Sequence, residues 1–314
     1  MKNYKILMFF LFLVGFSFFI GCEQNETTNT TGIVDVVIEN LPDPVYSNNQ
    51  ISIPVLVKNN GDSNIPNFNI LLIGSGFVEQ KTLEIKDILP KSQKIGFIET
   101  VGFKSEFLED ISNSKVLQFE YYYPYDGFSQ LIFCVEDPSS SYDPNKKPIC
   151  KASDPVKIYS KKSHVFLQNA KVEIQTKKNL ILTLSFSKNT EDTLYPATTV
   201  NELLSYLKNR NFGGLEGIYL NITSNFIDLE KSRCYFINQF GSESSSLLFE
   251  SSKIKTLQLF FHNKNIELKC NLIIKDQYVT QLTSPPYSVN IVLEMEYSYY
   301  VMGKVSKQLT IIKQ

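Results

Sequence analysis

Residues 289–299 read VNIVLEMEYSY, and this stretch has the most regular pattern in the chain. Its odd-numbered positions are all apolar or aromatic, and the positions between them are mostly polar. A period of two is typical of a β-strand that buries one face and exposes the other. The stretch therefore predicts a long strand close to the C-terminal end.

Shorter runs with strand character recur along the whole chain. They lie at residues 51–57, 68–73, 117–123, 131–135, 180–186 and 254–261. The composition agrees, because the chain has 17 Tyr and 23 Phe and no Trp. Aromatic and β-branched residues favour strands, and turn-forming residues separate these runs. The predicted fold class is all-β, built from antiparallel sandwiches.

Two stretches predict tight hairpins. Residues 117–123 and 131–135 alternate like strands, and Pro124-Tyr125-Asp126-Gly127 lies between them. Proline and glycine together are strong turn signals, so we expect the chain to reverse there. Gly303 separates the run at 289–299 from a last apolar run in the same way. A second reversal is expected at that glycine.

The length of 314 residues favours two domains. We expect a signal segment at 1–22, a flexible tether at 23–32, a first sandwich at 33–160 and a second at 161–314. The second should carry one short helix. Thr199 and Glu202 have the spacing of a capping box, leucines follow on one face, and Gly213-Gly214 would end the helix.

The stretch 51–73 is a strand ending in Val-Lys-Asn-Asn-Gly, followed by a second strand. It resembles the CARDB-like family of immunoglobulin-type modules found in exported bacterial and archaeal proteins. The resemblance covers about 40 residues well and a longer region loosely. It implies two tandem immunoglobulin-like domains and brings no catalytic residues with it.

The N-terminal 22 residues have the three parts of an export signal. Lys2 and Lys5 precede an apolar run at 6–21, which ends at Gly21-Cys22. The last four residues resemble a prokaryotic lipoprotein box, in which Cys22 would be lipidated and become the new N-terminus. Phe19 departs from the aliphatic residue usual in that box. An uncleaved anchor is the alternative, although this run of 16 residues falls short of the roughly 20 that span a bilayer. Simple secretion is the other alternative.

Residues 23–32 contain no large apolar side chain, which is typical of a flexible tether. Sequons for N-glycosylation begin at Asn25, Asn29 and Asn221. Such sequons are common by chance in a chain rich in Asn and Thr. They matter only in a host that glycosylates exported proteins.

Four cysteines remain once Cys22 is set aside, two in each half of the chain. In an oxidising compartment the simplest pairing joins Cys134 to Cys150 and Cys234 to Cys270. Four buried thiols are the alternative. A zinc site is disfavoured, because the spacings contain no C-x-x-C and neither histidine stands at ligand spacing from a cysteine. We therefore expect no metal and no cofactor.

The charge pattern disfavours nucleic-acid binding, and the presence of only two histidines disfavours histidine-dependent catalysis. The 31 basic and 32 acidic residues nearly cancel, and loss of Lys2 and Lys5 with the signal would leave a net charge of −3. No basic cluster stands apart from the acids, so we expect no nucleic-acid partner. His164 and His262 lie outside recognisable catalytic motifs and are expected to be solvated at strand ends. Paired carboxylates such as Glu109-Asp110, Asp228 with Glu230, and Glu294 with Glu296 leave a glycosidase open as an alternative.

Tyrosines at 121–123 and 125 could be core residues or a platform for a sugar or partner, since tyrosine is enriched at recognition surfaces. Both interpretations stay open at this point. Altogether the sequence predicts a non-enzymatic envelope lipoprotein, anchored through its N-terminal lipid on the extracellular face, at the cell surface or in the periplasm. Its role would be adhesion, structure or assembly through an envelope protein or glycan. The alternatives are a substrate-capturing lipoprotein of a transport system and an envelope glycan hydrolase.

Overall fold

The structure is a computed structural model of residues 1–314. It describes residues 32–39, 41, 45–46, 50–73, 82–100, 103, 114–136, 149–208, 216–237, 243–248, 255–261, 264–284 and 287–312. The predicted signal segment and most of the tether, with Cys22, Asn25 and Asn29, lie outside the described residues. His262 lies outside them as well.

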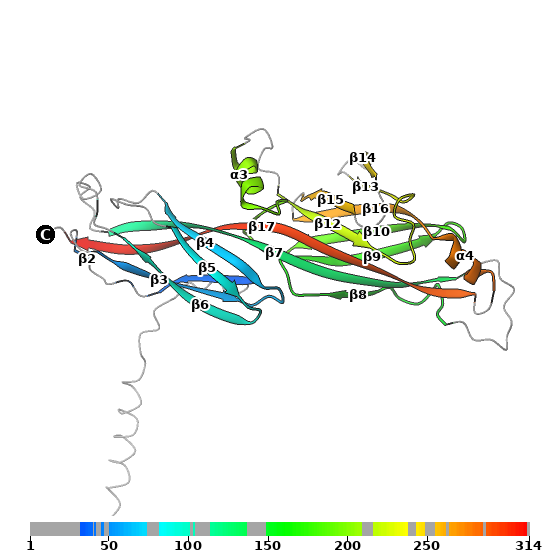
Figure 1. The fold of residues 1–314 in the computed structure, drawn as a ribbon, viewed down its shortest axis with the longest axis horizontal. Coiled ribbons are helices and arrows are strands. Elements are labelled where there is room, and N and C mark those ends of the chain that lie inside the picture. Colours follow the sequence, from blue (N-terminus) through cyan, green and yellow to red (C-terminus); the bar gives the residue numbers. More distant parts are fainter. Residues whose placement is uncertain are drawn as a thin grey trace, which may run out of the picture. The chain divides into compact units, whose positions relative to one another are not determined.

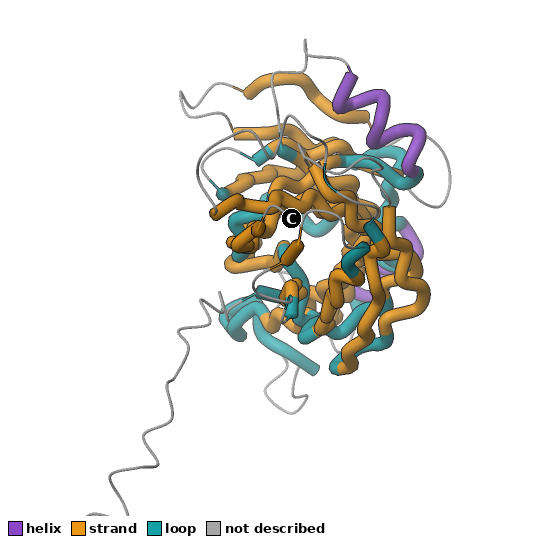
Figure 2. Tube along the Cα trace, turned by 90° about the vertical axis from the view of Figure 1, so that its left-hand side faces the viewer, coloured by secondary structure: helices purple, strands orange, loops and turns teal. Residues whose placement is uncertain are grey.

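Strands make up 67% of the structure and helices 7%, so the all-β prediction is confirmed. Figure 1 shows the strands in order, and Figure 2 shows that they account for most of the described chain. They form three sheets. The three-stranded sheet contains β1 (Val34–Ile38), β3 (Ser52–Asn59) and β6 (Ser92–Glu99). The five-stranded sheet contains β9 (Val165–Ile174), β10 (Asn179–Lys188), β13 (Arg233–Ile237), β14 (Glu243–Leu248) and β16 (Asn265–Ile273).

The nine-stranded sheet is organised around two long strands, β7 (Ser114–Glu136) and β17 (Ser288–Ile312). They are antiparallel and stay in register from Ser288 opposite Glu136 to Thr310 opposite Ser114. The other members are β2 (Val45–Tyr46), β4 (Ile65–Ile73), β5 (Thr82–Ile88), β8 (Lys157–Ser160), β11 (Thr193–Tyr195), β12 (Gly217–Thr223) and β15 (Lys255–Phe260). The run that begins at residue 289 is therefore a strand, as predicted, and it is longer than its alternating core.

Both predicted hairpins are wrong, because the chain continues straight through Gly127 and Gly303. A Cβ atom at Gly127 would collide with the ring of Tyr297, and one at Gly303 would collide with the ring of Tyr121. These glycines let a tyrosine of the opposite strand lie close to the backbone. A glycine inside a strand commonly marks such a close approach.

Pro124 fits within β7 for a different reason. It lies opposite Tyr300 of β17 on one side. On the other side the pairing with β4 ends at Tyr122, and the pairing with β8 begins at Ser129. The proline thus occupies a stretch where β7 has one neighbouring strand. Edge positions of this kind tolerate a residue that cannot donate a backbone hydrogen bond.

One buried cluster of apolar side chains runs through all three sheets. Its members include Val55 of the three-stranded sheet, Leu184 of the five-stranded sheet and Tyr123 of β7. Residues 32–314 accordingly form one compact unit. The two-domain, immunoglobulin-like division at residue 160 remains a prediction. Such a division would have to separate β7 from β17, which pair along their whole length.

Two helices, α3 and α4, interrupt the strands in the described part of the chain, where the sequence predicted one helix. The predicted helix is α3 (Val200–Lys208), and the Thr199 hydroxyl accepts a hydrogen bond from the Glu202 amide at 3.2 Å. The Glu202 carboxylate binds the Thr198 amide at 2.9 Å. The second helix, α4 (Asp276–Leu282), follows Lys275, which makes no side-chain cap. It has seven residues and no cap signal, so the sequence pattern did not reveal it.

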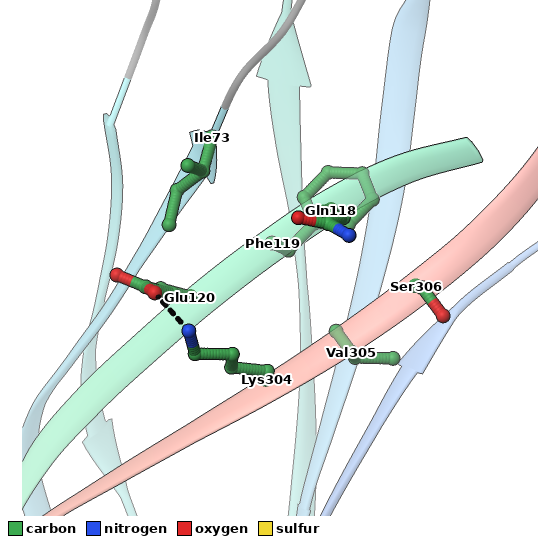
Figure 3. Close-up of a pocket in the computed structure, with 7 residues that line it drawn as sticks. All are labelled: Ile73, Gln118, Phe119, Glu120, Lys304, Val305 and Ser306. Carbon is green, nitrogen blue, oxygen red and sulfur yellow. Dashed lines mark ion pairs between the residues drawn. The ribbon is translucent and has the colours of Figure 1, made fainter. Parts of the chain in front are cut away.

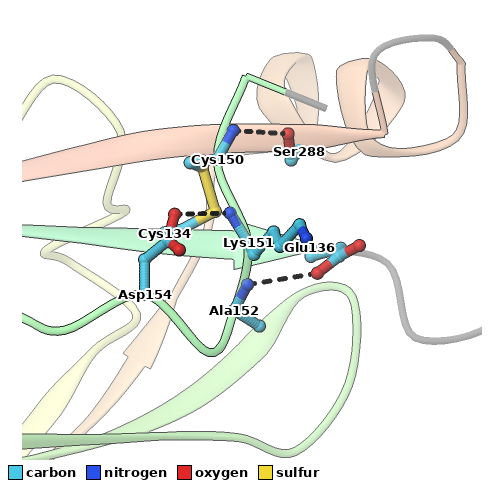
Figure 4. Close-up of a disulfide and its surroundings, with 7 residues drawn as sticks. All are labelled: Cys134, Glu136, Cys150, Lys151, Ala152, Asp154 and Ser288. Atoms are coloured by element: carbon cyan, nitrogen blue, oxygen red, sulfur yellow. Dashed lines mark hydrogen bonds between the residues drawn. A yellow bond between two sulfur atoms is a disulfide. The ribbon is translucent and has the colours of Figure 1, made fainter. Parts of the chain in front are cut away.

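Both predicted disulfides are present in the structure. Cys134 at the end of β7 is bonded to Cys150, and Cys234 of β13 is bonded to Cys270 directly opposite it in β16. Around the first bridge the Cys150 amide donates to the Ser288 hydroxyl at 3.4 Å, and the Ala152 amide donates to Glu136 at 3.1 Å (Figure 4). The bridge therefore holds the segment after residue 149 against the ends of β7 and β17.

No helix among the described residues is long and apolar enough to cross a bilayer. The predicted signal segment at 1–22 lies outside the described residues.

Candidate functional site

The long strand pair has an inner and an outer face, and the tyrosines divide between them. Tyr121, Tyr123 and Tyr125 point inward and are 7%, 0% and 1% exposed. They pack in the core with the ring of Phe68 and with Tyr299. These three tyrosines therefore cannot form the surface platform that the sequence left open. Tyr122, between them, points to the opposite face and is half-buried.

His164 is at the centre of this inner face, and the prediction that it is solvated was wrong. It is 1% exposed. The Tyr123 hydroxyl lies 3.1 Å from its Nε2 atom, and the Tyr299 hydroxyl lies 3.3 Å from its Nδ1 atom. Burial, together with nearby Lys188, lowers the pKa of the imidazole to about 3. The ring is therefore neutral at physiological pH and serves as a hydrogen-bonding core residue.

Ser163, next to His164, does not complete a catalytic arrangement with it. The serine hydroxyl donates to the carbonyl of Val165, and both ring nitrogens of His164 face tyrosine hydroxyls. A nucleophile needs its base within hydrogen-bond reach. This Ser–His neighbourhood has a structural explanation and supplies no activated hydroxyl.

The outer face of the β7–β17 pair is the strongest candidate for a working surface. Strand registers fix its rows, since residues paired across neighbouring strands point to the same side. From β12 or β11 through β17 to β7, the rows are Tyr195–Tyr300–Pro124, Tyr219–Ser298–Asp126, Asn221–Glu296–Phe128 and Thr223–Glu294–Gln130. We call these twelve side chains the outer face. It combines tyrosines, carboxylates and amides on the most extensively paired strands of the sheet.

The carboxylates of the outer face are exposed and close enough to influence one another. Asp126, Glu294 and Glu296 are all solvent-exposed. Partial desolvation, and secondly the nearby Glu296 carboxylate, raise the pKa of the Asp126 carboxyl. Glu294 accepts a hydrogen bond of 3.3 Å from the amide of Gln130. The outer face thus presents an acidic, hydrogen-bonding surface beside aromatic rings.

Helix α3 covers one end of the outer face. Leu203 is buried with Ala197 and Tyr300, and Tyr122 and Tyr195 pack against them. The Tyr219 hydroxyl donates a hydrogen bond to the carboxylate of Glu202. Val200, Leu204 and Leu207 point away and are 37%, 43% and 40% exposed. The exposed apolar side chains of the helix therefore lie next to the tyrosines and carboxylates of the outer face.

The sequence singled out only some of these residues, and for other reasons. Asn221 was predicted as a glycosylation site, and the structure places it inside β12 between β15 and β17. Glu294 and Glu296 were noted as a carboxylate pair, and they do share one face of β17. Asp126 was assigned to a turn. Alternation through Pro124 and Gly127 would have placed Asp126 on the same face of its strand as Phe128 and Gln130, but the two turn residues concealed it.

A cavity of about 260 Å³ opens farther along the same strands (Figure 3). Its lining includes Ile73, Glu120 and Lys304. Glu120 and Lys304 form an ion pair of 2.8 Å across it, and the Lys304 side chain is largely exposed. The two charges satisfy each other, so this cavity is a weaker candidate than the outer face. Among the described residues, no group of three or more His, Cys, Asp or Glu side chains could hold a metal ion.

Comparisons with known proteins do not assign the chain to a family. No family model matches the chain, and no curated protein matches it. A crystal structure of red sea bream transglutaminase aligns at 8% identity with a TM-score of 0.22, covering 90% of this chain and 32% of the transglutaminase chain. The chain thus spans about a third of the length of that protein.

Two further structures align as weakly. A DUF4466 family protein from Parabacteroides merdae has 9% identity and a TM-score of 0.16, with 77% of this chain and 98% of that chain covered. An archaeal virus protein, from work on a triple jelly roll fold and turret assembly, has 7% identity and a TM-score of 0.11, with 90% and 84% covered. Scores this low carry no argument about fold or function. The structure itself shows a disulfide-bonded all-β protein.

Proposed function

We propose that this protein is an exported envelope lipoprotein that holds a partner on its outer face without transforming it. The observation that carries the proposal is the outer face itself, where exposed carboxylates and amides share one rigid sheet with half-buried Tyr195 and Tyr219. Tyrosine supplies contact area at low entropic cost, and carboxylates and amides supply hydrogen bonds. The partner is an envelope protein or a glycan.

The two disulfides support the exported location. Disulfides persist outside the cytoplasm and are rare inside it. Anchoring through Cys22 rests on the sequence pattern of the first 22 residues. A diacylated cysteine carries two chains, which suffice for stable membrane attachment. Replacement of Cys22 with Ala should move the protein from the membrane fraction to the soluble fraction. Unchanged membrane partition would contradict the lipid anchor.

Capture of the partner from membranes tests the outer face. The full-length protein is cross-linked in the envelope and purified, alongside Glu296→Lys, which reverses one charge at the centre of the outer face. Recovery of the partner should fall by about tenfold, which corresponds to about 1.4 kcal/mol. The matched control is Glu267→Lys, an exposed strand position in β16 of the five-stranded sheet. Equal recovery with both variants, or no captured partner, would contradict the proposal.

A glycan hydrolase is the second candidate, and one observation favours it. The pKa of Asp126 is raised beside a second carboxylate, Glu296, as it is for the general acid of many glycosidases. Both side chains are exposed to solvent, whereas a general acid at neutral pH usually lies in an apolar pocket. Release of sugars from purified cell-wall polymer, lost in Asp126→Asn, would support hydrolysis over binding.

A transport role has less support. Substrate-capturing lipoproteins normally close two α/β lobes around a ligand. Strands make up 67% of this structure and helices 7%. This low share of helix therefore gives the transport alternative less support.

A further inference from the structure

The three-stranded sheet exposes apolar side chains on the face that points away from the core. Ile95 and Phe97 of β6 are 51% and 56% exposed. Leu56 lies opposite Ile95 and Pro54 opposite Phe97, while Val37 of β1 lies opposite Leu56. Leu56, Pro54 and Val37 are half-exposed. We call these five side chains the β1–β3–β6 patch.

The fold does not account for this patch. Ile53, Val55 and Val57 on the other face of β3 are already buried completely in the core. A strand with one core face and one solvated face would alternate apolar and polar residues. Here β3 is apolar on both faces from Ile53 to Val57. Contiguous exposed apolar side chains commonly mark an interaction surface.

The length of chain before β1 indicates what covers the patch. Eleven residues, 23 to 33, separate Cys22 from Val34, the first residue of β1. Eleven residues span at most about 40 Å when fully extended. A lipid on Cys22 would therefore keep the three-stranded sheet within a few nanometres of the membrane surface.

One lysine and three carboxylates surround the patch, and hydrogen bonds hold two of the carboxylates. Lys58 is exposed in the row next to Leu56 and can reach phosphate groups through its flexible stem. The Glu99 carboxylate, at the other end beyond Phe97, accepts a hydrogen bond of 2.7 Å from Ser52. Asp35, in the same row as Lys58, accepts a hydrogen bond of 2.7 Å from Asn60. The Glu39 amide donates to the Pro54 carbonyl at 3.0 Å, so a third carboxylate lies at the end of the Pro54–Phe97 row. The row of Val37, Leu56 and Ile95 carries no charge.

We propose that the β1–β3–β6 patch rests on the lipid surface to which Cys22 tethers the chain. The proposal depends on the lipid anchor of the proposed function. Phe97 and Ile95 enter the boundary between headgroups and acyl chains, and Lys58 lies among the phosphates. Contact there fixes how the sheet is oriented toward the membrane, which attachment at Cys22 alone would not.

The absence of tryptophan from the chain makes a direct test possible. In Phe97→Trp the new indole is the only tryptophan. The full-length variant is reconstituted in vesicles of phosphatidylethanolamine and phosphatidylglycerol, with and without lipids that carry a quencher near the headgroup. The matched control is Tyr159→Trp in β8, at a side chain that is 55% exposed and belongs to another sheet.

We expect the indole at position 97 to show blue-shifted emission and to be quenched several-fold more strongly than the indole at position 159. Equal quenching at the two positions would overturn it. Blue-shifted emission without quenching by lipid would also overturn it, because the patch would then be covered by protein. Sedimentation with the vesicles is recorded separately. A chain that sediments but shows no quenching refutes the patch alone, and a chain that fails to sediment refutes the anchor and the patch together.

Discussion

On the inner face of the β7–β17 pair the tyrosines are almost fully buried and surround His164, whereas the outer face exposes its carboxylates beside half-buried Tyr195 and Tyr219, and only Tyr300 there is buried, beneath helix α3. Both faces belong to the same 23-residue and 25-residue strands. The difference comes from alternation alone, which sends neighbouring residues to opposite sides. One pair of strands can thus provide the core of the protein and its candidate binding surface.

The largest expected effect separates the two faces by stability. Tyr299→Ala removes a fully buried ring and its hydrogen bonds to His164, and should cost about 3 to 5 kcal/mol of unfolding free energy. Tyr122→Ala, on the opposite face, should cost about 1 kcal/mol. Urea denaturation followed by circular dichroism measures both. Similar losses would show that the two faces contribute equally to the fold.

Removal of each disulfide tests how much the covalent links add to the free energy of unfolding, beyond what the packing of the inner face contributes. Cys134→Ser with Cys150→Ser should cost about 3 kcal/mol, since the bridge closes a loop with a sequence separation of 16. The Cys234–Cys270 pair, separated by 36 residues, should cost slightly more. Denaturation under non-reducing conditions checks this order. Full stability in both double variants would assign the stability to the tyrosine core.

His164 makes the stability of the inner face depend on pH. Its pKa of about 3 in the folded protein lies below the ordinary value of 6.5. The unfolded chain therefore binds a proton between these values and the folded chain does not. Stability should fall by up to about 1.4 kcal/mol per pH unit as the pH drops below 6.5. His164→Gln should flatten this slope between pH 6.5 and 5. An unchanged slope in the variant would contradict the burial argument.

The smallest expected effect concerns the outer face. Glu296→Gln removes a charge that contributes to the raised pKa of Asp126. Stability should change by no more than about 0.5 kcal/mol, as is usual for exposed positions. The pKa of Asp126, followed by NMR, should move down toward its ordinary value. If it stays raised to the same degree, desolvation alone accounts for the shift.

The sequence predicted the strands better than it predicted their connections. Alternation in residues 117–123 and 289–299 correctly placed Tyr121, Tyr123 and Tyr299 on one side of their strands. The spacing of cysteines also predicted both disulfides. These signals are local or involve simple pairing in an oxidising compartment.

The errors arose where distant residues decide the structure. Gly127 has the local signature of a turn, yet it lies in a strand because the ring of Tyr297, 170 positions later, occupies the space beside it. His164 follows Lys161 and Lys162, which suggested a solvated turn, but Tyr123 and Tyr299 enclose it. The outer face could not be predicted as a site, since its rows exist only once β12, β17 and β7 are in register.

Every functional inference requires the chain to leave the cytoplasm and remain attached through Cys22. Mass spectrometry of the mature protein, purified from membranes and alkylated without reductant, tests this most directly. The account predicts an N-terminal peptide that begins at a lipid-modified Cys22, together with unalkylated Cys134, Cys150, Cys234 and Cys270. An unmodified Cys22 within an intact N-terminus, or four alkylated cysteines, would contradict it.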